Sequence, residues 1–210
     1  MIIGLTGSMA AGKSTVSAML KELGFYIIDA DKTAHAAIET PEVRQRITEV
    51  FGDDILSPDG RIDRRLLAEK AFASAEKTAE LNAIIHPAVI ETMLEDADWF
   101  SLEYPEIPVV FDVPLLFESG MDKFCDRILT VAADDEIRYL RIMLRDGLTR
   151  EAAARRVEKQ MPQEEKIARS DAAVWNDKGL VELRANLLSA LAAIGCEPLG
   201  DYENDDNDGA

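Results

Sequence analysis

The sequence is poor in basic residues. Its 210 residues include 23 lysines and arginines against 40 aspartates and glutamates, which gives a formal net charge of −17. Proteins that bind nucleic acids in general need an excess of Lys and Arg to displace phosphate counterions, and anionic lipid surfaces attract the same residues. We therefore expect neither a nucleic acid nor a membrane as a partner.

Cysteine and histidine are also scarce, with two of each. Cys125 and Cys196 lie far apart and outside any CxxC pattern, so they predict neither a zinc site nor a disulfide framework. The N-terminal residues lack the positive flank and long apolar run of a signal peptide, and no apolar run has the length of a membrane span. These absences indicate a cytoplasmic protein, which we expect to be a monomer or a weak homo-oligomer.

The sequence does contain short apolar runs that alternate with helical patterns. The runs predict five β-strands, at 2–6, 25–28, 107–113, 127–132 and 172–174. Helical periodicity lies between them, beginning at 14–23 and ending at 178–194. This alternation predicts an α/β fold with a five-stranded parallel sheet flanked by helices, and such sheets bind ligands beyond the carboxyl ends of their strands.

Two helical segments interrupt this core. Residues 34–104 are predicted to be largely helical, with breaks at 57–60 and at His86-Pro87, and to form an inserted subdomain that binds the acceptor substrate. Residues 135–169 contain predicted helices at 135–145 and 149–160 and are expected to form a lid. We expect one domain over residues 1–198, with its core at about 1–33, 105–134 and 170–195, and a disordered acidic tail at 199–210.

The strongest motif joins the first strand to the first helix. Residues 7–14, Gly-Ser-Met-Ala-Ala-Gly-Lys-Ser, match the phosphate-loop pattern G-x-x-x-x-G-K-[ST] in full. The backbone N–H groups of such a loop converge on phosphate oxygens, Lys13 reaches the outer phosphates, and the Ser14 hydroxyl ligates Mg²⁺. The predicted ATP-binding residues here are Gly7, Ala10, Ala11, Gly12, Lys13, Ser14 and Thr15.

A phosphate loop also occurs in GTPases and in non-catalytic nucleotide sensors. The Asn-Lys-x-Asp motif that reads guanine is missing, which disfavours a GTPase. Asp29 and Asp31 end the second predicted strand, at the edge where the γ-phosphate should lie, and one of them could orient an acceptor hydroxyl. The alternative, which spacing alone leaves open, is that Asp31 caps the helix that follows.

A basic stripe favours a kinase. Arg138, Arg141 and Arg145 fall on one face of a predicted helix, and residues 138–159 carry seven bases against three acids in a chain whose net charge is negative. The plain alternative is a solvated helix face. The local reversal of sign instead favours a lid whose guanidinium groups neutralise the phosphates during transfer.

The order of these motifs resembles the dephospho-coenzyme A kinase family. Blocks that carry the resemblance are Gly-Leu-Thr-Gly at 4–7, Asp-Ala-Asp at 29–31, Phe-Gly at 51–52, Gly60 with Asp63-Arg64, Leu-Asn-Ala-Ile-Ile-His-Pro at 81–87, Pro-Leu-Leu-Phe-Glu at 114–118, Arg141, Arg145-Asp146, Gln160, and Asp171 with Asn176. The similarity covers residues 1–195. The chain departs from the family pattern in two places. Ser8-Met9-Ala10-Ala11 stands where relatives are richer in glycine, and Ser170 with Ala172-Ala173-Val174-Trp175 replaces a more typical Ala-Asp-x-Val-Ile-x-Asn stretch.

The resemblance implies ATP-dependent phosphorylation of the ribose 3′-hydroxyl of dephospho-CoA, the last step of CoA synthesis. It implies that Asp31 is the catalytic base, that Lys13, Arg141 and Arg145 act in catalysis, and that Asn176 helps to bind ATP. On the acceptor side it implies Thr6, Arg64 and His86, although a His-Pro pair before a long helix is more often structural. A kinase for another small acceptor and a non-enzymatic nucleotide-binding regulator remain open as alternatives.

Overall fold

The protein was analysed as a computed structural model, which describes residues 1–198. The predicted tail at 199–210 lies outside the described residues. The chain divides into two compact units, one formed by Ile28–Trp99 and the other by Met1–Ile27 together with the chain from Phe100 onward.

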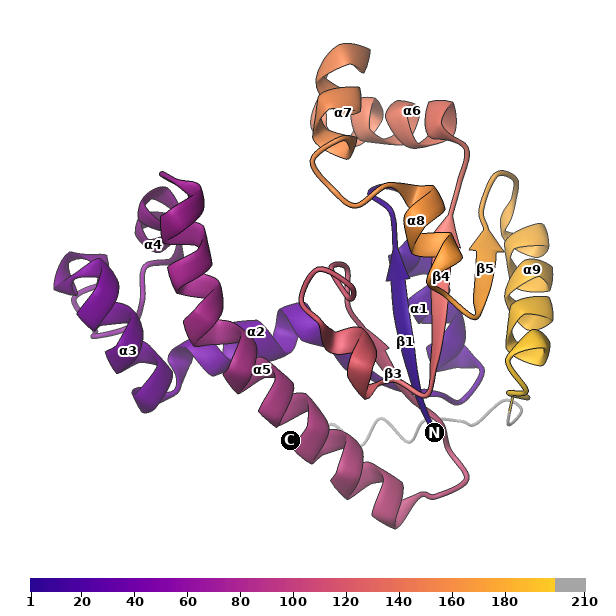
Figure 1. Cartoon of the computed structure of the whole chain (residues 1–210), viewed down its shortest axis with the longest axis horizontal. Coiled ribbons are helices and arrows are strands. Elements are labelled where there is room, and N and C mark those ends of the chain that lie inside the picture. Colours follow the sequence, from indigo (N-terminus) through magenta and orange to yellow (C-terminus); the bar gives the residue numbers. More distant parts are fainter. Residues whose placement is uncertain (199–210) are drawn as a thin grey trace. The chain divides into compact units, whose positions relative to one another are not determined.

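The unit of Met1–Ile27 and the chain from Phe100 onward is built on a five-stranded sheet in the order β2-β3-β1-β4-β5, and Figure 1 labels β3, β1, β4 and β5. The strands are β1 (Ile2–Gly7), β2 (Tyr26–Asp29), β3 (Val109–Asp112), β4 (Arg127–Ala132) and β5 (Ala172–Trp175). The pairs β1–β3, β1–β4 and β4–β5 are parallel. Continuous burial along β1, β3 and β4 explains their uninterrupted apolar runs, because helices cover both faces of a parallel sheet. The predicted α/β fold with a five-stranded parallel sheet is confirmed.

Helices α1 (Lys13–Glu22) and α9 (Leu180–Ala193) share one core cluster with the sheet. Val16 and Leu20 of α1 and Leu187 of α9 are fully buried beside Leu5 and Leu129 of the strands. Helix α8 (Gln163–Ala168) packs on β4, and Figure 1 shows it in front of the sheet while α1 lies behind it. Each fully buried Val or Leu contributes about 1.5–3 kcal/mol of transfer free energy, so this cluster holds the strand ends in place.

Beyond the carboxyl end of β4 the chain forms α6 (Asp135–Asp146) and α7 (Arg150–Val157), seen at the top of Figure 1. Three helices, counting α8, therefore occupy the segment for which two were predicted. The predicted second helix ran to residue 160, but the structure ends it at Val157. Pro162, which cannot donate a backbone hydrogen bond, then stands at the N-cap of α8 and fits the start of a new helix.

The unit of Ile28–Trp99 is helical. It contains α2 (Ala30–Glu39), α3 (Pro41–Phe51), α4 (Arg64–Ala71) and most of α5 (Ala75–Glu103) around buried Ile47, Ile55 and Met93. The predicted break at 57–60 is a turn closed by a bridge between Leu56 and Ile62. The predicted break at His86-Pro87 is wrong, because α5 continues through both residues. Apolar residues on both sides of Pro87, such as Ile84 and Val89, are buried, and this packing offsets the lost backbone hydrogen bond.

Candidate active site

The phosphate loop has several backbone N–H groups without a partner in the described chain. Three amides of the loop donate hydrogen bonds within the protein. Ser8 donates to the carbonyl of Val131, Ala11 to that of Ser8, and Thr15 to that of Gly12. Within residues 1–198, the amides of Ala10, Gly12, Lys13 and Ser14 have no acceptor. Lys13 and Ser14 also begin α1, whose N-terminus carries partial positive charge, so the loop is suited to bind an anion.

Two positions explain why the loop needs small residues. Gly12 has φ = 101°, and a β-carbon there would lie 2.1 Å from Nδ2 of Asn176. A β-carbon on Gly7 would lie 2.9 Å from the carbonyl oxygen of Val131. Ala10 is the one non-glycine residue at positive φ in the described chain, at 62°, a conformation that costs an L-residue free energy.

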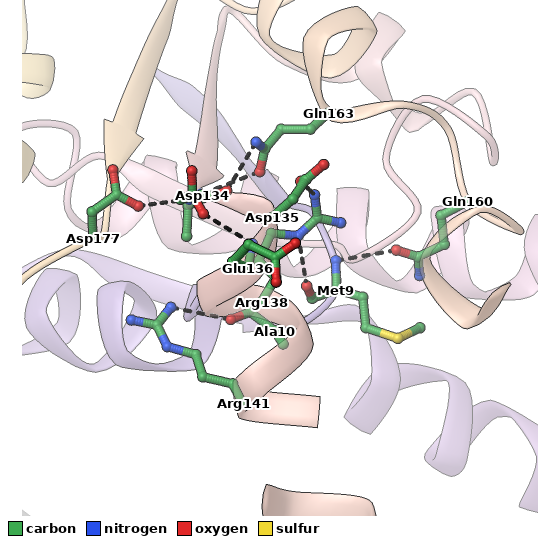
Figure 2. A network of polar contacts seen from close by, with 11 residues as sticks. Met9, Ala10, Asp134, Asp135, Glu136, Arg138, Arg141, Gln160, Gln163 and Asp177 are labelled. Atoms are coloured by element: carbon green, nitrogen blue, oxygen red, sulfur yellow. Dashed lines mark hydrogen bonds and ion pairs between the residues drawn. The ribbon is translucent and has the colours of Figure 1, made fainter. Parts of the chain in front are cut away.

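The loop's carbonyl groups are held from the opposite side by α6 (Figure 2). Arg138 donates from Nε to the Met9 carbonyl at 3.1 Å, and Arg141 donates to the carbonyls of Ala10 and Ala11 at 3.2 and 3.3 Å. Asn176 completes the brace by donating to Ala11 at 2.7 Å and accepting from Arg141 at 2.8 Å. The C=O and N–H of one trans peptide group point to opposite sides. A contact that fixes a loop carbonyl therefore also orients the N–H of the next residue.

The start of α6 is itself anchored. Asp134 caps the helix through the Glu136 amide, and its own N–H donates to Asp177 at 2.6 Å. Gln163 exchanges two hydrogen bonds with the Ala133 backbone, at 3.1 and 3.0 Å. The brace on the phosphate loop therefore rests on a well-connected helix end, drawn with its partners in Figure 2.

Lys13 forms an ion pair with Asp112, the last residue of β3. The register pairs Asp112 with Leu5 of β1, two residues before the phosphate loop. Asp112 is buried. The Lys13 ammonium has three N–H donors and uses one of them on Asp112, so two remain to bind a ligand. Asp112 was not predicted as a site residue, although an acid that ends an otherwise apolar strand was a usable signal.

A pocket of about 430 Å³ lies over the loop. Its lining comprises Gly7, Ser8, Met9, Ala10, Gly12, Lys13, Ser14, Thr15, Pro114, Arg141, Arg145 and Gln160. Most of the predicted nucleotide-binding residues thus meet at one cavity. Ala11 and Asn176 are buried and take part through the brace instead.

Thr6 does not line this pocket. It has no exposed surface, and its hydroxyl donates to the Pro114 carbonyl at 3.1 Å. The same carbonyl accepts a hydrogen bond from Lys166 at 3.2 Å, and the fully buried Lys166 forms an ion pair with Glu118 at 3.0 Å. Thr6 and Lys166 therefore fix the wall that follows β3. The sequence analysis did not single out Lys166, because nothing in its local pattern marks a buried lysine.

Arg145 faces the pocket but is bound to a neighbour. Its guanidinium makes two hydrogen bonds to Asp146, at 2.7 and 2.9 Å, and Arg156 also pairs with Asp146 at 2.6 Å. The hydrogen bond to Asp146 raises the pKa of Arg145, and Arg145 in turn lowers the pKa of Asp146. Arg145 stays largely exposed, so the pair is screened by water and can rearrange.

The predicted acceptor residues Asp31, Arg64 and His86 all belong to the helical unit. Asp29 caps α2 by accepting from the amides of Asp31 and Lys32, so the proposed cap is Asp29 and not Asp31. The Asp31 side chain lies exposed in the first turn. Arg64 is exposed and donates to the His35 carbonyl at 3.4 Å.

His86 lies in the middle of α5 and is half-buried. Burial lowers the pKa of its imidazole, which keeps the ring neutral near neutral pH. The contact of His86 with the acceptor substrate stays a prediction.

A parallel sheet, a full phosphate loop at the end of its central strand and a basic helix over the loop define a nucleotide-binding P-loop protein of the kinase type. A family model for dephospho-CoA kinase matches residues 1–182. The chain therefore belongs to the dephospho-CoA kinase family.

Individual relatives agree with this assignment. A dephospho-CoA kinase of Fusobacterium nucleatum is 45% identical over 183 residues, which covers 87% of this chain and 93% of the relative. Among solved structures, TT1252 from Thermus thermophilus is 36% identical with a TM-score of 0.76, and dephospho-CoA kinase from Campylobacter jejuni is 29% identical with a TM-score of 0.71. Both comparisons cover 92% of this chain and 96% of the other. Along residues 1–198 we find no helix with the length and apolarity to cross a bilayer.

Proposed function

We propose that this protein transfers the γ-phosphoryl group of ATP to the ribose 3′-hydroxyl of dephospho-CoA and so completes CoA biosynthesis. Membership of the dephospho-CoA kinase family supports this activity. The single structural observation that carries it is the phosphate loop: the amides of Ala10, Gly12, Lys13 and Ser14 have no acceptor within residues 1–198, and these residues line a pocket of about 430 Å³.

On the nucleotide side, the loop amides would bind the phosphates of ATP. Two N–H groups of Lys13 remain beyond its ion pair with Asp112 and would reach the outer phosphates. Asn176 would act through the loop, because it holds the Ala11 carbonyl. Arg141 both donates to the loop carbonyls and lines the pocket.

Mg²⁺ would be held by Ser14 and Asp112. The Ser14 side chain is exposed at the pocket, and no group within residues 1–198 hydrogen-bonds its hydroxyl. Asp112 supplies a carboxylate beside the loop, and Mg²⁺ prefers oxygen ligands, so the donor set fits the ion. When bound, the ion would neutralise charge on the β- and γ-phosphates.

On the acceptor side, we propose that Asp31 orients the 3′-hydroxyl and receives its proton late in the reaction. Transfer through a loose transition state needs positioning and charge compensation more than a strong base. Asp31 is exposed and does not cap α2, so its carboxylate is available for this role. Arg64 and His86 would bind other parts of dephospho-CoA. Arg145 would leave Asp146 for the transferring phosphate.

A coupled ADP-release assay with and without dephospho-CoA tests the proposal. We expect ADP formation that depends on dephospho-CoA and a product heavier by one phosphoryl group. A 3′-deoxy analogue of dephospho-CoA should bind without being phosphorylated, which identifies the hydroxyl.

Two outcomes would contradict the proposal. Faster turnover of another acceptor in a panel of small alcohols and nucleoside monophosphates would assign a different kinase activity. ATP binding without phosphorylation of any acceptor would indicate a nucleotide-binding regulator. The cytoplasmic location stays a prediction from the sequence.

A further inference from the structure

Gln160 contacts the phosphate loop from the link between α7 and α8. Its Oε1 accepts a hydrogen bond from the Met9 amide at 3.2 Å (Figure 2), and both residues line the pocket over the loop. Of the two polar atoms of the Gln160 side chain, only Oε1 has a hydrogen-bond partner within residues 1–198.

The Met9 contact fixes how the carboxamide is oriented. A backbone N–H can only donate, so the atom that faces it must be the oxygen, and the NH₂ group lies on the other side of the side chain. Within the described part of the chain nothing accepts a hydrogen bond from Gln160 Nε2. The NH₂ group is therefore an unused double donor at the pocket.

The Met9 peptide is a firm support for this orientation. Its carbonyl accepts from Arg138 Nε at 3.1 Å, and Arg138 is only 3% exposed and forms an ion pair with Asp135 at 2.7 Å. Met9 is thus held on its carbonyl side by a buried guanidinium and on its amide side by Gln160. A side chain oriented in advance loses little conformational entropy when it binds a ligand.

The pocket indicates which phosphate the NH₂ group would meet. In a phosphate loop the backbone amides hold the inner phosphates, and the lysine reaches the outer two. Lys13 and Gln160 line the same pocket over the loop. The unused NH₂ group is therefore available to the outer phosphates that Lys13 would reach.

We propose that Gln160 is a specificity-determining residue that donates from Nε2 to the terminal phosphate of ATP, with its carboxamide oriented by the Met9 amide. The inference rests on the proposed function only in that ATP is the ligand. It predicts that Gln160 distinguishes ATP from ADP, because ADP lacks the phosphate that the NH₂ group would bind.

Isothermal titration of the full chain with Mg-ATP and with Mg-ADP, without acceptor, tests this inference. For Gln160→Ala we expect about a tenfold rise in the Kd for ATP and less than about a twofold rise for ADP, since hydrogen bonds to charged groups are the stronger ones. Gln160→Glu should weaken ATP binding further, because its carboxylate still accepts from Met9 but places negative charge against the phosphate. Gln45→Glu, the same change at an exposed position on α3, is the matched control and should leave both Kd values unchanged.

Equal losses for ATP and ADP, or unchanged ATP affinity, would overturn the inference and leave Gln160 with a purely structural role. If Gln160→Ala unfolds below the assay temperature, Gln160→Met replaces it in the titrations, because Met preserves the length of the side chain and removes both polar atoms. Variants that show the expected ATP-over-ADP effect, in a protein that never phosphorylates dephospho-CoA, would support the inference and overturn the proposed function.

Discussion

At the scale of single residues, Gly12 and Asn176 show how tightly the phosphate loop is built. Position 12 requires glycine for two separate reasons. Its backbone is left-handed, and a β-carbon there would lie 2.1 Å from Asn176. Asn176 can reach the Ala11 carbonyl only because Gly12 has no side chain. The glycine of the motif thus serves packing as well as backbone conformation.

We predict that Gly12→Ala lowers the free energy of unfolding by more than the 1–3 kcal/mol typical of positive-φ strain, because it also displaces Asn176. ATP binding should be lost even at temperatures where the variant is folded. Gly60→Ala is the control, since Gly60 has φ = 78° but no atom of the described chain lies within 4 Å of a β-carbon built there. Urea titrations of both variants would measure the difference, and equal destabilisation would contradict the role given to Asn176.

Asp31 is the residue whose chemistry matters most to the proposed reaction. We expect Asp31→Asn to lower kcat by about 10²–10⁴-fold while the Kd for ATP stays nearly unchanged. Asp29→Asn is the matched control, because asparagine caps helices as well as aspartate does and Asp29 is the cap of α2. Steady-state kinetics of both variants decide the matter. Unchanged turnover in Asp31→Asn would remove Asp31 from catalysis.

At the scale of elements, α6 acts as a brace for the phosphate loop. The sequence predicts that its three arginines form one stripe that neutralises phosphates. In the structure, Arg138 and Arg141 donate to loop carbonyls, while Arg145 remains exposed beside Asp146. Arginine suits the bracing task because its planar fork can donate to several oxygens at once. Helical spacing put the three on one face, but only the approach of the loop distinguishes them.

We predict that Arg141→Lys raises the KM for ATP about tenfold or more. An ammonium cannot span the three carbonyls of Ala10, Ala11 and Asn176 that Arg141 reaches. Arg184→Lys is the control and should match the parent, because Arg184 is half-exposed and its one ion pair within residues 1–198 is with Glu22. Kinetics at varied ATP concentration provide the measurement. A variant that keeps the parental KM would show that the brace does not affect nucleotide binding.

Helix α8 supports the other wall of the pocket through Lys166. We expect Lys166→Met to lower the free energy of unfolding by about 2–4 kcal/mol, because it leaves the Glu118 carboxylate without its buried partner, while the Pro114 carbonyl keeps only the hydrogen bond from Thr6. Replacing both charged residues in Lys166→Met/Glu118→Gln should recover part of this loss. Urea unfolding of the single and double variants measures the coupling. Additive losses would show that the ion pair contributes little.

At the scale of the whole molecule, the two compact units divide the predicted work. Every residue of the phosphate loop and its brace belongs to the unit that contains the sheet, whereas Asp31, Arg64 and His86 belong to the helical unit. Such a division suits an enzyme with two substrates, because each substrate can be bound by separate elements.

We predict that ATP and dephospho-CoA protect different parts of the chain from hydrogen exchange. ATP alone should slow exchange at residues 7–15 and in α6, and dephospho-CoA alone should slow exchange within 28–99. Exchange followed by mass spectrometry of peptides distinguishes the two patterns, with the buried strand β4 as an internal reference that neither ligand changes. Protection of 28–99 by ATP alone would contradict the division of roles.

Much of this protein follows from its sequence by local rules. Alternating apolar runs and helical periods determine the strands and the α/β class, and the loop motif places Lys13 and Ser14 at a helix N-terminus, because such signals depend only on residues close along the chain. Contacts between distant segments have no such signature. Only the tertiary structure decided that Asp112 pairs with Lys13, that Arg141 and Asn176 hold the loop from behind, and that α5 runs through Pro87. Each of these depends on groups at least 35 residues apart or on helix packing, which no short stretch of sequence encodes.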